Sequence, residues 1–328
     1  MKENRKIILL LVSLCCFFGY TLFHNEMVVN EVLYYTNLFI HKLFPTSFLF
    51  LVLSFLLIDY QFVFFLQKFL HMNSVYFYFF IMSFLSGFPT GAVYVKEAYL
   101  QGIISREDAN RIIRFAHFPN PLFVLFTVSE AFNSQRTALI LYSIIFFSNF
   151  ILFIIYQRKR KISVSNSLPL DFSQELSSSI MKSFKIIILI YGTSLFFYLI
   201  SSFIRKYTIS SSFLYVFVSG LFDLTNGVVS SSILTSTFLQ GCLLFFFIGF
   251  GSISIHFQIK SILSDTSISY HSFLIGRIYS LLICLFLWII YCSCTVWICC
   301  CYWELSILIY TTCLIVNRSY DINGIFCS

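Results

Sequence analysis

The sequence predicts an all-α, polytopic membrane protein of two repeated halves with broken or re-entrant helices, with about eight spans and about two hairpin-like segments. Three observations indicate this class: an apolar composition, basic clusters at the ends of apolar runs, and glycine-containing interruptions in both halves. Of 328 residues, 59% are hydrophobic and 11% are charged, whereas soluble domains carry about 25% charged residues. This composition excludes a soluble enzyme, a disordered chain and a coiled coil.

The distribution of basic residues identifies the lipid bilayer, and not a nucleic acid, as the partner of this chain. The formal net charge is +7. Lys2, Arg5 and Lys6 precede an apolar run, and the basic residues 158–161 follow another. Basic residues at the ends of spans are typical of cytoplasmic loops in membrane proteins. We therefore expect a multi-pass protein of the cell membrane.

The cysteines indicate neither a metal site nor a cofactor. Eight of the eleven cysteines fall between Cys284 and Cys327, without the paired spacing of zinc ligands. We interpret them as small hydrophobic residues of a lipid-facing helix. Nucleophile, metalloprotease and phosphate-loop motifs are also missing from the sequence, so we expect no enzyme activity and no cofactor.

Three apolar runs are long enough to span a membrane without interruption, because a span needs about 20 residues. A further run near the N-terminus is interpreted as an uncleaved first span, since no small-residue cleavage site follows it. Four other runs are interrupted by glycine, proline or polar residues. The uninterrupted runs are residues 138–156, 186–204 and 273–296, and the first span is 6–23. The interrupted runs are 38–57 (at 44–46), 75–100 (at 86–92), 213–234 (at 225–227) and 233–263 (at 249–252).

The chain divides into four regions. Residues 1–156 form the first membrane half, and residues 184–300 form the second. A basic, serine-rich cytoplasmic linker, 157–183, joins them, and a tail of undecided structure, 301–328, follows. A shift of 164 positions places Gly87 on Gly251, and both stretches then continue with a short helix and a polar turn. This internal repeat is typical of transporters whose sites lie at matching broken helices.

The interruption at residues 86–92 has the composition of an anion site. Pro89 ends one helix, while Gly87 and Gly91 permit a turn and a close backbone approach. The helix that restarts there presents free N–H groups and a positive dipole end. The interruption around Gly251 repeats this arrangement. The alternative for each is a kink that only lets helices pack.

Three further polar side chains are candidates. Asn120 lies between two prolines as an N-cap that also contacts substrate, or as a cap alone. Asp223 is a carboxylate in an apolar segment, hence a functional candidate, or else a partner of Lys260 or Arg277. His256 is either structural or a donor to substrate. The complete candidate site is Gly87, Phe88, Thr90, Gly91, Asn120, Asp223, Asn226, Gly227, Gly251, Ser252, Ser254 and His256.

Four motifs carry a resemblance to a known family: SGFPTGA at 86–92, NPLF at 120–123, GLFDLTNG at 220–227 and FGSISIHFQ at 250–258. With these motifs the chain resembles the YlbJ family of sporulation integral membrane proteins over most of residues 1–285. Members are similar to the nucleoside-recognition "Gate" domain of nucleoside-transporter and ferrous-iron-transporter proteins. The resemblance implies transport of dipicolinic acid across the outer forespore membrane during sporulation, for spore cortex formation.

We therefore expect a transporter for a small anionic solute, with dipicolinate as the first candidate. The main alternative is a non-transporting membrane scaffold for spore cortex assembly, acting through the linker 157–183. An intramembrane enzyme is the third alternative, and no nucleophile–base pair supports it. The sequence leaves a homo-oligomer open.

Overall fold

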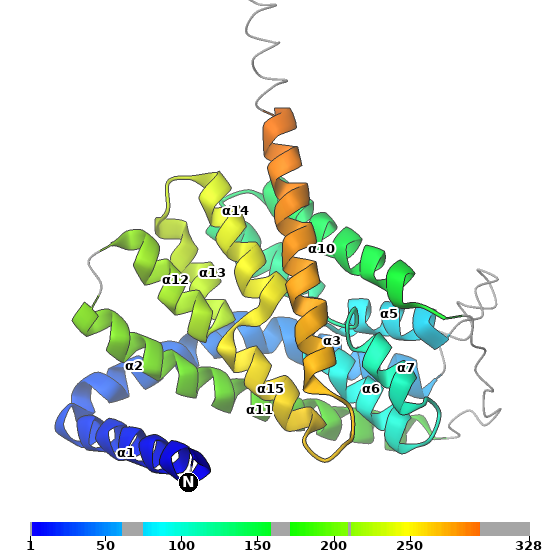
Figure 1. Cartoon of the computed structure of the whole chain (residues 1–328), viewed down its shortest axis with the longest axis horizontal. Helices are drawn as coiled ribbons and strands as arrows, with labels where there is room; N and C mark the ends of the chain where they lie inside the picture. The colour runs from blue at the N-terminus through cyan, green and yellow to red at the C-terminus, as the bar shows by residue number, and fades with distance from the viewer. Residues whose placement is uncertain (1, 61–74, 159–170, 209–210, 296–328) are drawn as a thin grey trace, which may run out of the picture. The chain divides into compact units, whose positions relative to one another are not determined.

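The computed structural model describes residues 2–60, 75–158, 171–208 and 211–295, and all regular secondary structure in these ranges is helical (Figure 1). By length and composition, four of the described helices could cross a membrane, or up to five if one bent pair is a single span. Apolar side chains stay exposed on them, for example Ile188 and Leu282. The chain is therefore a helical, membrane-embedded protein. It divides into two compact units, Met1–Cys284 and Leu285–Ser328.

Three of the four candidate spans cover the three uninterrupted runs expected from the sequence. They are α10 (Gln135–Tyr156), α11 (Phe172–Thr208) and the helix Tyr270–Thr295. The fourth, Thr237–Leu263, includes the interruption expected at residues 249–252. The tail 301–328 and the linker residues 159–170 lie outside the described residues.

The N-terminal region contains a long bent pair of helices. α1 (Lys2–Phe23) covers the expected first span, although it is not among the four candidates found in the described residues. α2 (Asn25–Leu38) continues through the π-helical turn η1 (Phe39–Leu43) into α3 (Phe44–Asp59). The axis bends by 47° between Asn25–Leu43 and Ser47–Leu57. The interruption expected at residues 44–46 is therefore a bend, as proline near the start of a helix favours.

The remainder of the first half consists of short helices. α7 begins with a capping box, in which the Ser105 hydroxyl accepts from the Asp108 N–H (3.2 Å). These elements are α5 (Val75–Ser86), α6 (Thr90–Leu100), α7 (Arg106–Ile112), α8 (Pro121–Phe123), η2 (Val124–Val128) and α9 (Ser129–Ala131).

In the second half, the interruption that the sequence predicts at residues 225–227 lies about one helical turn earlier. The extended residue is Asp223 (φ −137°, ψ 124°), and residues 225–227 are helical. An aspartate is a strong N-cap, so it begins the new helix before Asn226 and Gly227 can interrupt it. The elements are α12 (Ser212–Phe222), α13 (Leu224–Ser230), η3 (Ser231–Ile233), α14 (Thr237–Phe245), η4 (Phe246–Gly251) and α15 (Ile253–Leu263).

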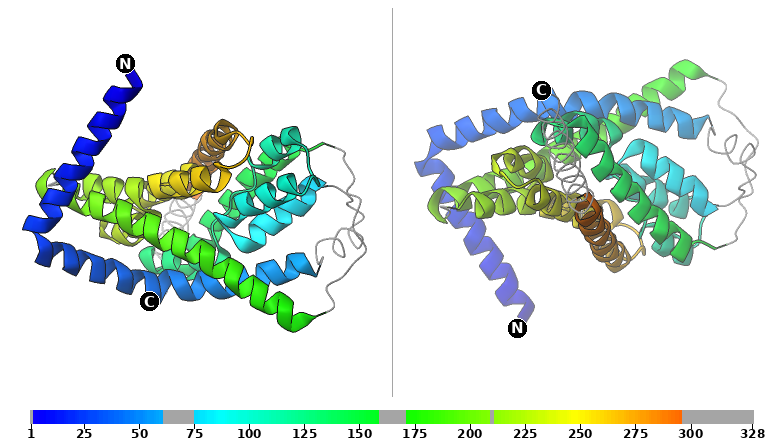
Figure 2. Two further views of the ribbon diagram at one scale, coloured as in Figure 1. Left: turned by 90° about the horizontal axis from the view of Figure 1, so that it is seen from below. Right: turned by 90° about the horizontal axis from the view of Figure 1, so that it is seen from above.

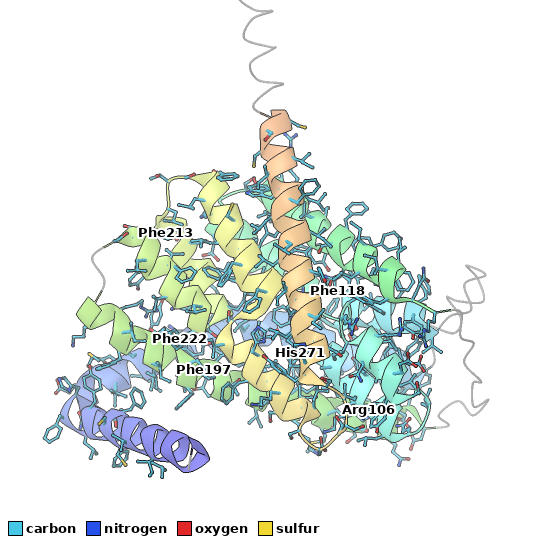
Figure 3. All side chains as sticks on the ribbon, viewed as in Figure 1. Arg106, Phe118, Phe197, Phe213, Phe222 and His271 are labelled. Atoms are coloured by element: carbon cyan, nitrogen blue, oxygen red, sulfur yellow. The ribbon has the colours of Figure 1, made fainter. Side chains whose placement is uncertain are left out.

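α11 is the helix around which the first unit is organised. It packs against α2, α3, α12 and α15, and the views of Figure 2 show it running beside α2 and α3. Aromatic side chains fill many of these contacts. Figure 3 shows Phe197 of α11 next to Phe222 of α12, with ring centroids 6.4 Å apart.

Glycine permits one very close helix approach. A Cβ atom on Gly227 would lie 2.2 Å from the Gly220 Cα atom, and a Cβ on Gly220 would lie 2.2 Å from the Phe247 ring. The backbones of α12 and α13 are therefore in direct contact, with the Phe247 ring closing the gap beside them. Only glycine fits these two positions.

Candidate functional site

A cavity in the first unit lies where the interruptions of the two halves meet. The cavity volume is about 40 Å³. One water molecule needs about 10–15 Å³. All four interrupted segments contribute residues to its wall. The lining residues are Leu43, Ser47, Phe88, Asn120, Phe123, Ile190, Ser194, Asp223, Leu224, Thr225, Ser254, Ile255 and Gln258.

The interruption before α6 packs against the proline-flanked Asn120. Gly87 has φ +74°, and a Cβ on it would lie 2.8 Å from the Asn120 Cα atom. The Phe88 N–H donates to the Phe118 carbonyl (2.7 Å), and the Phe88 ring stacks on His117 with centroids 4.7 Å apart. These contacts hold Phe88 and Asn120 on the same wall of the cavity.

Asn120 is the N-cap of α8, as its sequence context predicts. Its Oδ1 accepts from the N–H groups of Leu122 (2.9 Å) and Phe123 (3.4 Å), and Pro121 occupies the first helical position. Asn120 also lines the cavity. The cap and a contact with solute are therefore compatible roles.

Asp223 lies at the corner between α12 and α13 and is 1% exposed. Its Oδ1 accepts from the Asn226 N–H (2.9 Å), and its Oδ2 accepts from the Tyr35 hydroxyl (3.1 Å). The Ser194 hydroxyl and the Thr225 N–H also interact with this carboxylate, so its partners are all uncharged. The alternative pairing with Lys260 or Arg277 does not occur among the described contacts.

The interruption before α15 contacts the end of α12. Gly251 has φ +107°, and the Ser252 hydroxyl donates to the Gly220 carbonyl (2.7 Å). The His256 Nδ1 shares a hydrogen bond with the Tyr270 hydroxyl (2.7 Å). His256 therefore supports the start of α15 from outside the cavity wall.

Arg277, 1% exposed, satisfies carbonyl groups released by the interruptions. Its guanidinium donates to the carbonyls of Arg114 (3.1 Å) and Gly249 (3.4 Å), and to the Asn149 side chain (3.1 Å). Backbone carbonyls need partners at membrane depth, and a guanidinium supplies five N–H groups. Sequence reasoning missed this role, because the partners lie far away along the chain.

Several buried polar atoms around the interruptions have no hydrogen-bond partner. They are the Thr90 hydroxyl, the Asn226 amide nitrogen, the Ser254 hydroxyl and the His256 Nε2. The helices α6 and α15 also start without a side-chain cap bond. Free donors at a helix N-terminus are suited to an anion or to water.

The end of α6 and the start of α7 contact the loop that follows α15. Lys96 Nζ lies 2.7 Å from Asp265 Oδ1, and the Tyr99 and Ser267 hydroxyls share a hydrogen bond (2.6 Å). Arg106 Nε donates to the Ser267 carbonyl (2.9 Å). The two halves are thus joined by ionic and polar contacts away from the cavity.

The structure brings part of the candidate site to the cavity. Phe88, Asn120, Asp223 and Ser254 line it. The remaining candidates are in the supporting turns and helix starts: Gly87, Thr90, Gly91, Asn226, Gly227, Gly251, Ser252 and His256. Sequence reasoning missed Ser194 and Gln258, which line the cavity from α11 and α15. Serine and glutamine inside an apolar helix are the signals that could have identified them.

Within the described ranges, no three His, Cys, Asp or Glu side chains are grouped closely enough to hold a metal ion. Comparison with known proteins found no matching family model, no matching curated protein and no matching solved structure.

Proposed function

We propose that this chain is a membrane transporter for a small anionic solute, with dipicolinate as the first candidate. The observation that carries the proposal is the cavity lined from all four interrupted segments. Helices interrupted at membrane depth are tolerated where they are buried in protein or line a water-filled cavity. Transporters place their solute at such interruptions.

We infer that the two halves are structural repeats and that about eight spans cross the membrane. This inference is supported by the match between the segments around Gly87 and Gly251. Both glycines have positive φ, and each is followed by an 11-residue helix, α6 or α15. The next helices start at Arg106 and Tyr270, and the shift of 164 positions that aligns Gly87 with Gly251 also aligns these two residues.

An anionic solute is supported by the donors around the cavity. α15 starts at the cavity without a side-chain cap, and its Ser254 hydroxyl is buried and unpartnered. Asn120 and Phe88 line the same space, and their side chains carry an amide and a flat aromatic ring. A planar dicarboxylate could therefore accept hydrogen bonds at its ends and stack on an aromatic ring.

The resemblance to the YlbJ family supports dipicolinate in particular. It rests on the motifs at residues 86–92, 120–123, 220–227 and 250–258. Under this proposal the protein lies in the outer forespore membrane and supplies dipicolinate for spore formation. The scaffold alternative requires no cavity, and for that reason transport is the favoured function.

The proposal is tested by narrowing the cavity without disturbing the interruptions. Ser47 lines the cavity from the start of α3, so Ser47→Leu places an apolar side chain in it. Ser143 is an exposed serine of α10, so Ser143→Leu is the matched control. We expect uptake of labelled dipicolinate into proteoliposomes to fall about tenfold or more for Ser47→Leu and to be unchanged for the control. Equal uptake by both variants contradicts the proposal, and uptake by neither of these nor by the unmodified protein favours the scaffold.

A further inference from the structure

Asp223 is the one ionisable side chain among the residues that line the cavity. The other lining residues are apolar, hydroxyl-bearing or amide-bearing. A buried carboxylate in a membrane protein is costly and is a functional candidate by default. If the cavity receives an anion, the Asp223 carboxylate and the solute carry charges of the same sign in a confined, largely apolar space.

The hydrogen-bond partners of Asp223 do not neutralise it. The hydroxyls of Tyr35 and Ser194 and the N–H groups of Thr225 and Asn226 interact with the carboxylate, and none of them carries a positive charge. Arg205 of α11 is committed elsewhere. Its guanidinium donates to the hydroxyls of Ser201 (3.1 Å) and Ser219 (2.9 Å).

The ionisable groups on the packed elements have other partners or are exposed. On α11, Tyr198 donates to Glu31 of α2, and Arg205 lies over the Tyr198 ring at 5.4 Å. Arg205 also lies over Tyr215 of α12 at 4.9 Å. On α15, His256 bonds to Tyr270 and Lys260 is exposed. None of these contacts places a cation on the Asp223 carboxylate.

A proton on Asp223 removes the repulsion between the carboxylate and an anionic solute. A solute that prefers the protonated protein also raises the proton affinity of Asp223 by the same factor, because the linkage between two ligands is reciprocal. We propose that Asp223 binds the proton that accompanies each anion through the cavity, so that transport is proton-coupled. The proton is taken up at the carboxylate on the side of entry and is released when the anion leaves on the other side. This inference rests on the proposed function.

Asp223→Asn is the decisive variant, because asparagine has nearly the same shape as a protonated aspartate. Its Oδ1 retains the acceptor for the Asn226 N–H, and its Nδ2 group can donate to the Tyr35 hydroxyl, as the proton of a protonated aspartate would. Asparagine is also as good an N-cap as aspartate. The variant cannot exchange a proton. Asp171→Asn, at an exposed carboxylate before α11, is the matched control.

The experiment uses the full chain in proteoliposomes with labelled dipicolinate as the probe. For the unmodified protein we expect an inward proton gradient to drive accumulation, and downhill dipicolinate entry to make the weakly buffered external medium more alkaline. For Asp223→Asn we expect gradient-driven accumulation to fall about tenfold or more, while exchange of internal for external dipicolinate stays within about twofold of that of Asp171→Asn.

Accumulation by Asp223→Asn equal to that of the unmodified protein overturns the inference. So does dipicolinate entry through the unmodified protein without a change in external pH, and this result does not depend on the folding of any variant. Absence of both uptake and exchange in the unmodified protein refutes the proposed function itself, so the two failures are distinguishable.

Discussion

Arg277 and Asn149 bind each other and also donate to the same backbone carbonyl, that of His117. The Asn149 amide lies 3.1 Å from the carbonyl oxygen, and the Arg277 guanidinium lies 3.5 Å from it. His117 directly precedes the segment that leads to Asn120, so the two side chains complete the hydrogen bonding of an interrupted backbone. The interruption is stable in this apolar surrounding because residues from both halves supply the missing donors.

Replacement of Arg277 by methionine should destabilise the protein strongly. The change withdraws the Arg277 donors from the carbonyls of Arg114 and Gly249, and each buried acceptor left unpaired costs about 1–3 kcal/mol. We expect a clear fall in the thermal unfolding midpoint in detergent. Arg136→Met, at an exposed arginine of α10, is the control and should leave the midpoint nearly unchanged. Equal midpoints for the two variants would contradict the role assigned to Arg277.

Two glycines with the same backbone conformation should respond differently to alanine. Gly87 and Gly102 have φ +74° and +72°, and alanine in this region costs about 1–2 kcal/mol. At Gly87 the new Cβ would also lie 2.8 Å from the Asn120 backbone, whereas nothing lies within 4 Å at Gly102. We expect Gly87→Ala to lower the unfolding midpoint clearly more than Gly102→Ala does. A larger effect at Gly102 would show that the approach of Gly87 to Asn120 is not required.

Asn120 can be tested separately as a cap and as a cavity residue. Asn120→Ala removes the acceptor for two N–H groups and should cost about 1 kcal/mol of stability. Asn120→Asp retains the cap and adds a negative charge to the cavity wall. Two charges about 5 Å apart repel by about 3 kcal/mol at an effective dielectric of about 20. We therefore expect Asn120→Asp to lose dipicolinate uptake about tenfold or more. Retained uptake would argue against an anion in this cavity.

The ion pair between Lys96 and Asp265 predicts a pH dependence. The hydrogen bond from the Lys96 ammonium lowers the pKa of the Asp265 carboxyl below its ordinary value of 3.8. Since the folded pKa is lower than the unfolded one, this contribution to stability is present above pH 3.8 and is lost as the pH falls further, through the folded pKa. Asp265→Asn should therefore lower the unfolding midpoint at pH 7 and have little effect below the folded pKa. High salt should reduce the difference at pH 7, because the pair is partly exposed.

Charge reversal provides a second check on the same pair. Lys96→Glu places two acidic groups together and should lower the unfolding midpoint. The double variant Lys96→Glu with Asp265→Lys restores opposite charges and should recover most of the loss. No recovery would mean that the two side chains do not interact.

Local patterns predicted the local structure well. The cap at Asn120 follows from the two prolines beside it, and the three uninterrupted apolar runs lie in helices long enough to span a membrane. The sequence predicts the interruption at residues 225–227 about one turn too late, because Asn226 and Gly227 are stronger turn signals than the N-cap aspartate that precedes them.

The sequence does not predict hydrogen-bond partners that lie far apart along the chain. Tyr35 and Asp223 are 188 positions apart, and Arg277 and Asn149 are 128 positions apart. Periodicity and propensity describe neighbours along the chain. They identify Asp223 as an unusual carboxylate in an apolar segment, but they do not predict that the Tyr35 hydroxyl binds it. The cavity itself is a product of such distant contacts.

The touching backbones at Gly220 and Gly227, with the Phe247 ring beside them, prevent α12 and α13 from sliding past each other. Packed segments of this kind rearrange as rigid bodies. In any rearrangement of the protein, Asp223 must therefore move together with both helices as one body. The backbone changes that permit such a motion have to occur in the connections outside this pair.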